Sequence, residues 1–576
     1  MSSFFGLNIA KSGLFAAQKS LNTVGHNIAN ANTRGYSRQR IELVSSNPLS
    51  SPNGSGMIGT GVDSKHVTQI RNEFLDIKYR SENTVYGQWD FRNKSLEEIE
   101  AIMNEPGDSG IRKVMDDFFS SFEELSKDPS SITTRTVVRE RAIAFTNSIN
   151  QMHSQFDNML KNTDASIEYT VNQINTYAND IAHLNDQIYQ AELGGSNAND
   201  LRDQRNVLLD DLSELVDVEI TEVSQGNDNL SKKMRICING QPLVAHDKVD
   251  PIVIQKQPHK YKDELGIEFD VKSIGFKSGS PINTNNIQGT LKAQIDMRDN
   301  LNDADGAKGI PYYMNKLDEF VSRFAAELDV QHFAGYGLDS AGTGNLFFKE
   351  RDIAKDTMDS TKFTTNEKLG LGEIHDPTGI ISPAPTPAVT SIKDYIQKQK
   401  DLGKTESEAI KEWEDTYKGY TLASDDEGNW YEVEKLSAKD LQISSKIDKD
   451  VDYIAAAKKH TDDGKGIAGD NSNINAVWDL RHDDGMFTWG SPDDFIKSMV
   501  SNLGVEAQES QRMVDNQAVL VTQIDNTRQS ISGVSIDEEM SNMIKFQHAY
   551  NASARMITAV DEMIDVIVNR MGKVGM

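Results

Sequence analysis

The chain has 576 residues, which is too long for one hydrophobic core and therefore suggests several domains. Its 60 basic and 88 acidic side chains give a formal net charge of −28, so nucleic acid and anionic membrane surfaces are poor partners. No run of about eighteen apolar residues occurs, and we expect no membrane-spanning segment. The single Cys237 excludes an intrachain disulfide and a cysteine-based metal site.

An apolar repeat of seven residues begins the chain. One row contains Leu7, Leu14, Leu21 and Ile28, and the row three residues further on contains Ala10, Ala17, Val24 and Ala31. This spacing places an apolar stripe along one side of a helix, and another helix must cover that stripe. Because the second row consists mainly of alanine, the helix buries little apolar area alone and needs a neighbour.

The middle of the chain alternates between helical and strand-like patterns. A helical pattern extends from about residue 67 to 215, and its longest piece carries Leu160, Ile167, Ile174, Ile181 and Ile188 at seven-residue spacing. Alternation with period two over residues 218–223, and again between residues 236 and 271, predicts a small β domain inserted in a helical frame. A second insertion, residues 349–436, contains a proline-rich linker, one helix and two possible strands.

A second apolar repeat closes the chain. Its main row contains Met543, Tyr550, Ile557, Ile564 and Met571, with Phe546, Val560 and Ile567 beside it. Ser535 and Glu538 have the spacing of a capping box, so a helix should begin there after the break at residues 532–534. Helices at opposite ends of one chain most simply pair with each other or with their copies in neighbouring subunits.

These patterns predict an elongated, multidomain α+β fold. We expect the terminal helices to form a coiled-coil-like inner domain from residues 1–62 and 531–576. A long helical-bundle rod domain should comprise residues 63–216, 288–348 and 437–530. Residues 217–287 should form an inserted β-rich domain, and residues 349–436 a second inserted outer module.

No catalytic or metal-binding pattern emerges from the sequence. The eleven histidines are scattered, and none has the spacing of a helical zinc motif. Residues 303–306 resemble the middle of a calcium loop, but Leu301 and Tyr312 occupy its first and last ligand positions. We therefore expect no enzyme activity and no cofactor.

The segment from His26 to Tyr36 resembles the N-terminal signature of bacterial flagellar rod, hook and hook-associated proteins. Its motif positions are Asn27, Asn30, Asn32, Thr33, Gly35 and Tyr36. The segment from Ser532 to Arg555 resembles the C-terminal signature of the same family. Tyr36–Gln39, Asp200–Arg205 and the stretch from Ile310 to Phe348 favour the hook-associated branch.

The resemblance implies a structural component of the flagellum that joins hook to filament by polymerising through its terminal helices. The alternative is a hook or distal-rod protein of the same family. The expected assembly interface consists of Leu7, Leu14, Leu21, Ile28, Met543, Tyr550, Ile557, Ile564 and Met571. The implied partners are copies of the chain itself, the hook protein, a second hook-associated protein beside the filament, and an export chaperone at the C-terminal helix. Such a protein is secreted by the flagellar type III system into the extracellular flagellum, without a signal peptide.

Overall fold

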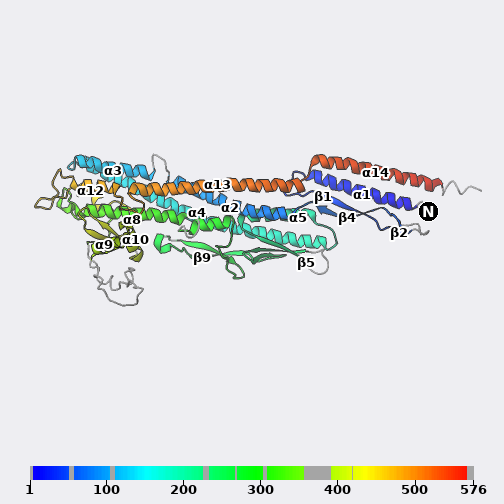
Figure 1. Ribbon diagram of the computed structural model, residues 1–576, viewed down its shortest axis with the longest axis horizontal. Coiled ribbons are helices and arrows are strands. Elements are labelled where there is room, and N and C mark those ends of the chain that lie inside the picture. The colour runs from blue at the N-terminus through cyan, green and yellow to red at the C-terminus, as the bar shows by residue number, and fades with distance from the viewer. Residues whose placement is uncertain are drawn as a thin grey trace, which may run out of the picture.

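The computed structural model describes residues 4–50, 57–103, 110–224, 232–265, 267, 269–301, 308–355, 391–417 and 419–566. Long helices and small antiparallel sheets form an elongated α+β molecule, as the sequence predicts (Figure 1). The described α-helices are α1 (Phe4–Ala29), α2 (Glu73–Met103), α3 (Ile111–Lys127), α4 (Ile132–Glu192), α5 (Asn199–Leu215), α6 (Lys262–Leu265), α7 (Thr290–Asp299), α8 (Ile310–Ala334), α9 (Ile392–Asp401), α10 (Glu406–Thr416), α11 (Ser445–Lys449), α12 (Ser472–Asp479), α13 (Pro492–Ser532) and α14 (Ile536–Asp565).

The described strands are short and antiparallel. They are β1 (Gln39–Ser45), β2 (Leu49–Ser50), β3 (Met57–Ile58), β4 (Val62–Gln69), β5 (Glu219–Ser224), β6 (Lys232–Ile238), β7 (Gln241–Ala245), β8 (Lys248–Val249), β9 (Ile252–Pro258), β10 (Asp270–Phe276), β11 (Ile353–Lys355), β12 (Tyr420–Ser424) and β13 (Trp430–Glu434). They pair as β1–β4, β2–β3, β5–β6–β7–β8, β9–β10 and β11–β13–β12.

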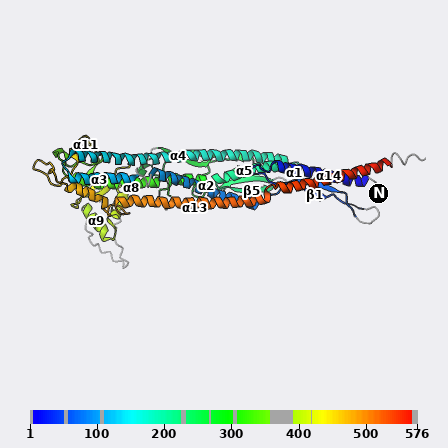
Figure 2. The ribbon, with the colours of Figure 1, turned by 90° about the horizontal axis from the view of Figure 1, so that it is seen from above.

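A helical body made of α2–α5, α7, α8, α12 and α13 carries the largest core. Helices α4 and α13 run along opposite sides of this body (Figure 2). Helix α4 has 61 residues without proline or glycine, so it extends for about 90 Å. The five residues of its predicted row, from Leu160 to Ile188, are all buried. Far from the termini, the Phe118 ring lies 5.3 Å from that of Phe145 and 6.1 Å from that of Phe324.

The β-rich segment between α5 and α7 packs on one side of α4. Buried Ile236, Leu243 and Val244 belong to the same apolar cluster as Ile174 and Ile181 of α4. The alternation that predicts these strands therefore has a physical cause, because one face of the sheet is covered by the helix while the other meets solvent.

The strands β12 and β13 of residues 391–436 form a three-stranded sheet with β11, and this sheet is covered on both faces. On one face, Tyr431 and Val433 of the central strand β13 pack with Ala326 and Val330 of α8. On the other face, helices α9 and α10 contribute Trp413 and further apolar residues to a separate cluster. The proline-rich linker at residues 382–387 lies outside the described residues.

Candidate assembly interface

Helices α1 and α14 lie side by side and run in opposite directions at one end of the molecule (Figure 1). Three facing pairs mark their register: Gly6 with Val560, Gly13 with Ser553, and Asn27 with Glu539. Equal steps along both helices separate these pairs, so the two helices form one regular antiparallel seam.

Small side chains occupy the centre of this seam. Gly6, Gly13, Ser20 and Asn27 recur at seven-residue spacing, and Ser20 and Asn27 are each 1% exposed. A methyl carbon placed on Gly13 would lie only 3.1 Å from Ser553 Oγ. Small residues at a helix contact permit a short distance between the helix axes. The row of Ala10, Ala17 and Val24 lies next to this centre and is also buried.

The larger apolar residues of the N-terminal repeat flank the seam. Leu7, Leu14, Leu21 and Ile28 are each only half-buried. Phe15 is 50% exposed, and Lys11 Nζ lies 5.8 Å from the centre of its ring. We call Leu7, Lys11, Leu14, Phe15 and Leu21 the open face of α1. Within one chain this face has no complete cover.

Helix α14 is also covered on one side only. Met543, Tyr550, Ile557 and Ile564 of the predicted row are half-buried, while Val560 beside them is 8% exposed. Met540, Ile544, Met556 and Met563 are each more than half exposed. Met571 lies outside the described residues. The assignment of these residues to an assembly interface stays a prediction.

A buried ion-pair network ties the start of α14 to the end of α1. Arg38 Nε donates to Glu539 Oε1 at 2.8 Å, and its two terminal nitrogens donate to Glu538 at 2.9 and 3.0 Å. Asn27 Nδ2 donates to Glu539 Oε2 at 3.0 Å and to the Gln39 carbonyl at 2.8 Å. The Glu539 side chain is only 2% exposed, so these donors replace the hydrogen bonds with water that its carboxylate loses on burial.

The motif residues after α1 shape the loop that leads to this network. Gly35 has a φ of +78°, and a side chain there would also collide with Val207 of α5. Tyr36 donates its hydroxyl hydrogen to Asn27 Oδ1 at 2.8 Å, and burial raises the pKa of Tyr36. Asn30 Nδ2 donates to the His26 carbonyl, and Thr33 Oγ1 donates to Asn30 Oδ1. Asn32 is exposed.

Acidic residues of α5 bind this joint to the helical body. Asp203 accepts the backbone N–H of Ser37 at 2.9 Å and pairs with Arg71 at 3.4 Å. Arg528, near the end of α13, donates to Asp210 at 2.6 Å and covers the ring of Tyr79. Sequence reasoning missed these contacts because the partners lie 166 and 318 positions apart and leave no local pattern.

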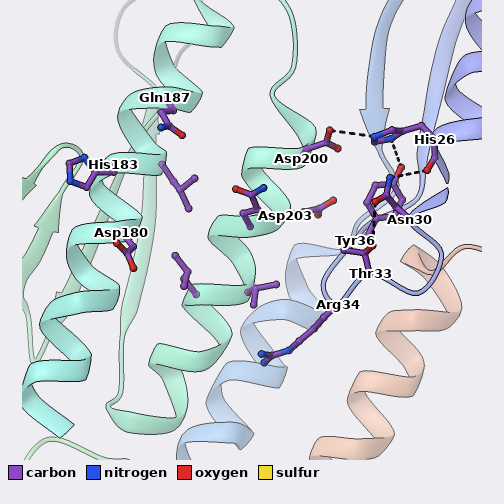
Figure 3. Close-up of a pocket in the computed structure, with 14 residues that line it drawn as sticks. His26, Asn30, Thr33, Arg34, Tyr36, Asp180, His183, Gln187, Asp200 and Asp203 are labelled. Carbon is purple, nitrogen blue, oxygen red and sulfur yellow. Dashed lines mark hydrogen bonds and ion pairs between the residues drawn. The ribbon is translucent and has the colours of Figure 1, made fainter. Parts of the chain in front are cut away.

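A cavity of about 690 Å³ lies between the loop after α1 and the hairpin of α4 and α5 (Figure 3). We call it the joint groove. Leu184, Val207 and Leu208 supply its apolar lining, and its polar lining includes Asp180, His183 and Asp200. At one wall, His26 Nε2 lies 3.6 Å from Asp200 Oδ2, and His26 Nδ1 lies 2.9 Å from the Tyr36 hydroxyl.

Among the described residues, no group of three or more His, Cys, Asp or Glu side chains could hold a metal ion. The calcium-like segment 303–306 lies outside them.

Comparison with known proteins identifies the family. Residues 96–348 match the model of the flagellar hook-associated protein FlgK helical domain. Residues 7–36 match the flagella basal body rod protein model, and residues 526–571 match the C-terminal model of the flagellar basal body rod FlgEFG protein. Flagellar hook-associated protein 1 of Bacillus subtilis is 29% identical over 99% of both chains. The protein of that name from Salmonella typhimurium is 25% identical over 98% of this chain and 99% of its own.

The chain belongs to the family of flagellar hook-associated proteins. The hook junction protein FlgK of Burkholderia pseudomallei shares its fold, with a TM-score of 0.53 and 14% identity over 79% of this chain and 100% of that one. The multidomain α+β class predicted from the sequence is thereby confirmed.

Membership in the hook-associated family settles the broad function. The protein is a structural component of the bacterial flagellum, and it is not an enzyme. It assembles with other flagellar components. None of the described helices combines the length and apolar character needed to cross a membrane.

Proposed function

We propose that this hook-associated protein forms the junction between hook and filament and polymerises there through α1 and α14. The observation that carries the proposal is the half-covered state of both terminal helices. Their seam contains mainly small residues, while Leu7, Leu14, Leu21 and the row from Met543 to Ile564 keep part of their surface in water. Full burial of one such side chain contributes about 1.5–3 kcal/mol, so a neighbouring subunit would gain considerably by covering them.

A junction protein lies between two different polymers, the hook and the filament, and its proposed partners follow from that position. One end of the assembled zone contacts the hook protein, and the other contacts a second hook-associated protein next to the filament. Contacts between copies of the chain itself complete the zone. The family name shared by the relatives supports a position at the hook, and the resemblance of both termini to rod proteins supports the same mode of packing.

Delivery to this position proceeds through the flagellar type III export channel, with the chain unfolded. The absence of any intrachain disulfide suits such a route, since the single Cys237 leaves nothing to reduce before export. An export chaperone holds the C-terminal helix beforehand. The exposed Met540, Ile544, Met556 and Met563 offer an apolar surface that such a chaperone would cover.

Electron microscopy of a strain that lacks the protein tests the junction role. We expect cells with hooks but no filaments, while unpolymerised filament protein accumulates in the medium. Complementation with a tagged chain should restore filaments and place the tag between hook and filament. A strain without hooks would instead indicate a hook or rod protein, and normal filaments would refute the proposal.

A further inference from the structure

The N-terminal end of the chain differs in charge from the rest. Residues 1–40 contain five lysines and arginines and no aspartate or glutamate. Residues 540–560 contain Lys545 and Arg555 and no acidic residue, although the whole chain carries a net charge of −28. Acidic residues flank that stretch, so α14 as a whole has six acidic and two basic side chains. Helix α1 carries two lysines and no acidic residue, and it is therefore a cationic helix attached to a strongly anionic chain.

The open face of α1 combines this charge with apolar surface. Lys11 lies over Phe15, and the half-buried Leu7 and Leu14 adjoin it on the same face. Among the described residues, no ion pair involves Lys11, and its side chain is exposed. A surface of this kind fits a groove with an apolar lining and acidic residues at its edge.

The joint groove has an apolar lining and acidic residues at its edge, and Arg34, which also lines it, is paired with Asp211. Its apolar lining comes from Leu184, Val207 and Leu208, and its volume of about 690 Å³ exceeds by far what a single water molecule needs. Figure 3 shows Asp180 on α4 and Asp200 on α5 at opposite sides of it. Asp180 is exposed, with no ion pair among the described residues, and the Asp200 side chain is 58% exposed.

We propose that the joint groove of one copy receives the open face of α1 from a second copy, with Lys11 beside Asp180. This inference rests on the proposed function, because it supplies the contact by which successive copies join. The α1 of the same chain cannot make the contact. Its last turn, at His26, forms a wall of the groove, and Phe15 lies about 16 Å away along the helix.

The geometry of this contact suits a growing assembly. The donor surface on α1 and the acceptor groove between α4 and α5 are different patches of one chain. Contacts between unlike patches leave one donor and one acceptor free at the ends, so they generate rings or helices instead of closed dimers. Because the contact pairs Lys11 with a carboxylate, assembly should weaken at high ionic strength.

Cysteine cross-linking in assembled flagella tests the contact directly. Because Cys237 is the only cysteine, Cys237→Ser provides a cysteine-free background. Into it we would introduce Lys11→Cys and Asp180→Cys together and treat isolated hook–filament complexes with a short bismaleimide. We expect a ladder of cross-linked multimers from the flagella and none from the soluble monomer. Each single-cysteine variant, and Lys11→Cys combined with Lys113→Cys on distant α3, should give no ladder.

A charge exchange provides the second test. Asp180→Lys should lower the fraction of cells with filaments several-fold, and Lys11→Asp should do the same. The double variant should recover most of the loss, because the ion pair is restored with its polarity reversed. Since both residues are exposed, circular dichroism of the secreted monomers should match wild type.

The outcomes separate this inference from the proposed function. If tagged protein is present at the junction but no ladder forms and the charge exchange gives no recovery, the joint groove is not the α1 site while the junction role stands. If Asp180→Lys alone assembles as well as wild type, the pairing is wrong. If the protein is absent from isolated hook–filament complexes, both the junction role and this contact fail.

Discussion

The guanidinium group of Arg38 lies 2.8 Å from the carboxylate of Glu539, although 501 positions separate these residues in the chain. This ion pair closes the joint at which the terminal helices meet the helical body. Asn27 donates to the same carboxylate from the last turns of α1. Two parts of the chain that are remote in sequence, residues 27–38 and the start of α14, therefore share one buried charge, and the orientation of the terminal pair depends on it.

Removal of Arg38 should loosen this joint. In Arg38→Ala, Glu539 keeps only Asn27 as a side-chain donor, and breaking a buried ion pair in this way costs about 3–5 kcal/mol. We expect faster amide hydrogen exchange over residues 536–545 and 20–30. Arg40→Ala is the matched control, since Arg40 is exposed and should leave the exchange unchanged. Adding Glu539→Gln to Arg38→Ala should recover part of the protection, and equal exchange in all variants would contradict this role.

The terminal helices show how far sequence patterns reach. Both repeats predict helices correctly because helix periodicity is a local property. The pattern does not show which row forms the centre of the seam, because the largest apolar side chains of the repeat, such as Leu7 and Leu14, give the strongest signal. The centre instead contains Gly6 and Gly13, since a close antiparallel contact with α14 favours the smallest side chains. Asn27, Arg38 and Glu539 lie in the segments that resemble the family signatures, but no local pattern pairs them, because only the fold brings them together.

The small-residue seam predicts a position-specific effect of bulk. Gly13→Leu should force α1 and α14 apart, because even a methyl carbon there would lie 3.1 Å from Ser553 Oγ. We expect loss of filaments and faster proteolysis of both terminal helices in the monomer. Gly25→Leu is the control, because nothing lies within 4 Å of an added methyl carbon at that position. Equal filament counts for the two variants would mean that the seam tolerates larger spacing.

The module at residues 391–436 marks another limit of sequence reasoning. The sequence predicts a helix before two strands, and the structure has α9 and α10 followed by β12 and β13. Gly403, with a φ of +85°, lies between the two helices. The sequence does not show that Val433 packs against α8. A strand has the same alternating pattern whether the helix that covers it is nearby or remote in the chain.

Asp318 on α8 predicts a pH dependence of stability. Burial, together with the nearby charge of Asp440, raises the pKa of Asp318 to about 7. The Asp318 carboxylate accepts the backbone N–H of Ala438 at 2.7 Å, and this hydrogen bond offsets part of the rise in pKa. A carboxyl group with a raised pKa in the folded state favours folding at low pH. That contribution is lost as pH rises from about 4 to about 7. We expect the melting temperature of the helical body to fall by a few degrees between pH 5 and pH 8.

Asp318→Asn isolates this contribution. The amide oxygen can still accept the Ala438 N–H, and no charge needs to be buried. The variant should therefore exceed the wild-type melting temperature slightly at pH 5 and by more at pH 8. Glu124→Gln on α3, at an exposed position with no ion pair among the described residues, should follow the wild-type curve. A wild-type melting temperature that rises between pH 5 and pH 8, with no difference for Asp318→Asn, would contradict the assignment.

The C-terminal helix should be the part of the chain most sensitive to charge. Ile564 is half-buried in the apolar row of α14 that lies beside Val560 and Ser553, and the proposed assembly would bury the remainder. An aspartate there must lose its hydration without a partner, which costs several kcal/mol, and the apolar contribution of the isoleucine is lost as well. Ile564→Asp should therefore abolish filament growth while the helical body keeps its melting temperature.

Secretion separates the two routes to this defect. Normal amounts of Ile564→Asp in the culture medium without filaments would mean failed polymerisation, whereas retention in the cell would mean that the export chaperone no longer holds the helix. Thr558→Asp is the control, because Thr558 is an exposed polar residue of α14 outside the apolar surface proposed for the chaperone, and a carboxylate there stays hydrated. It should be secreted and should assemble far better than Ile564→Asp. Wild-type motility of Ile564→Asp would show that this row of α14 is not a buried assembly surface.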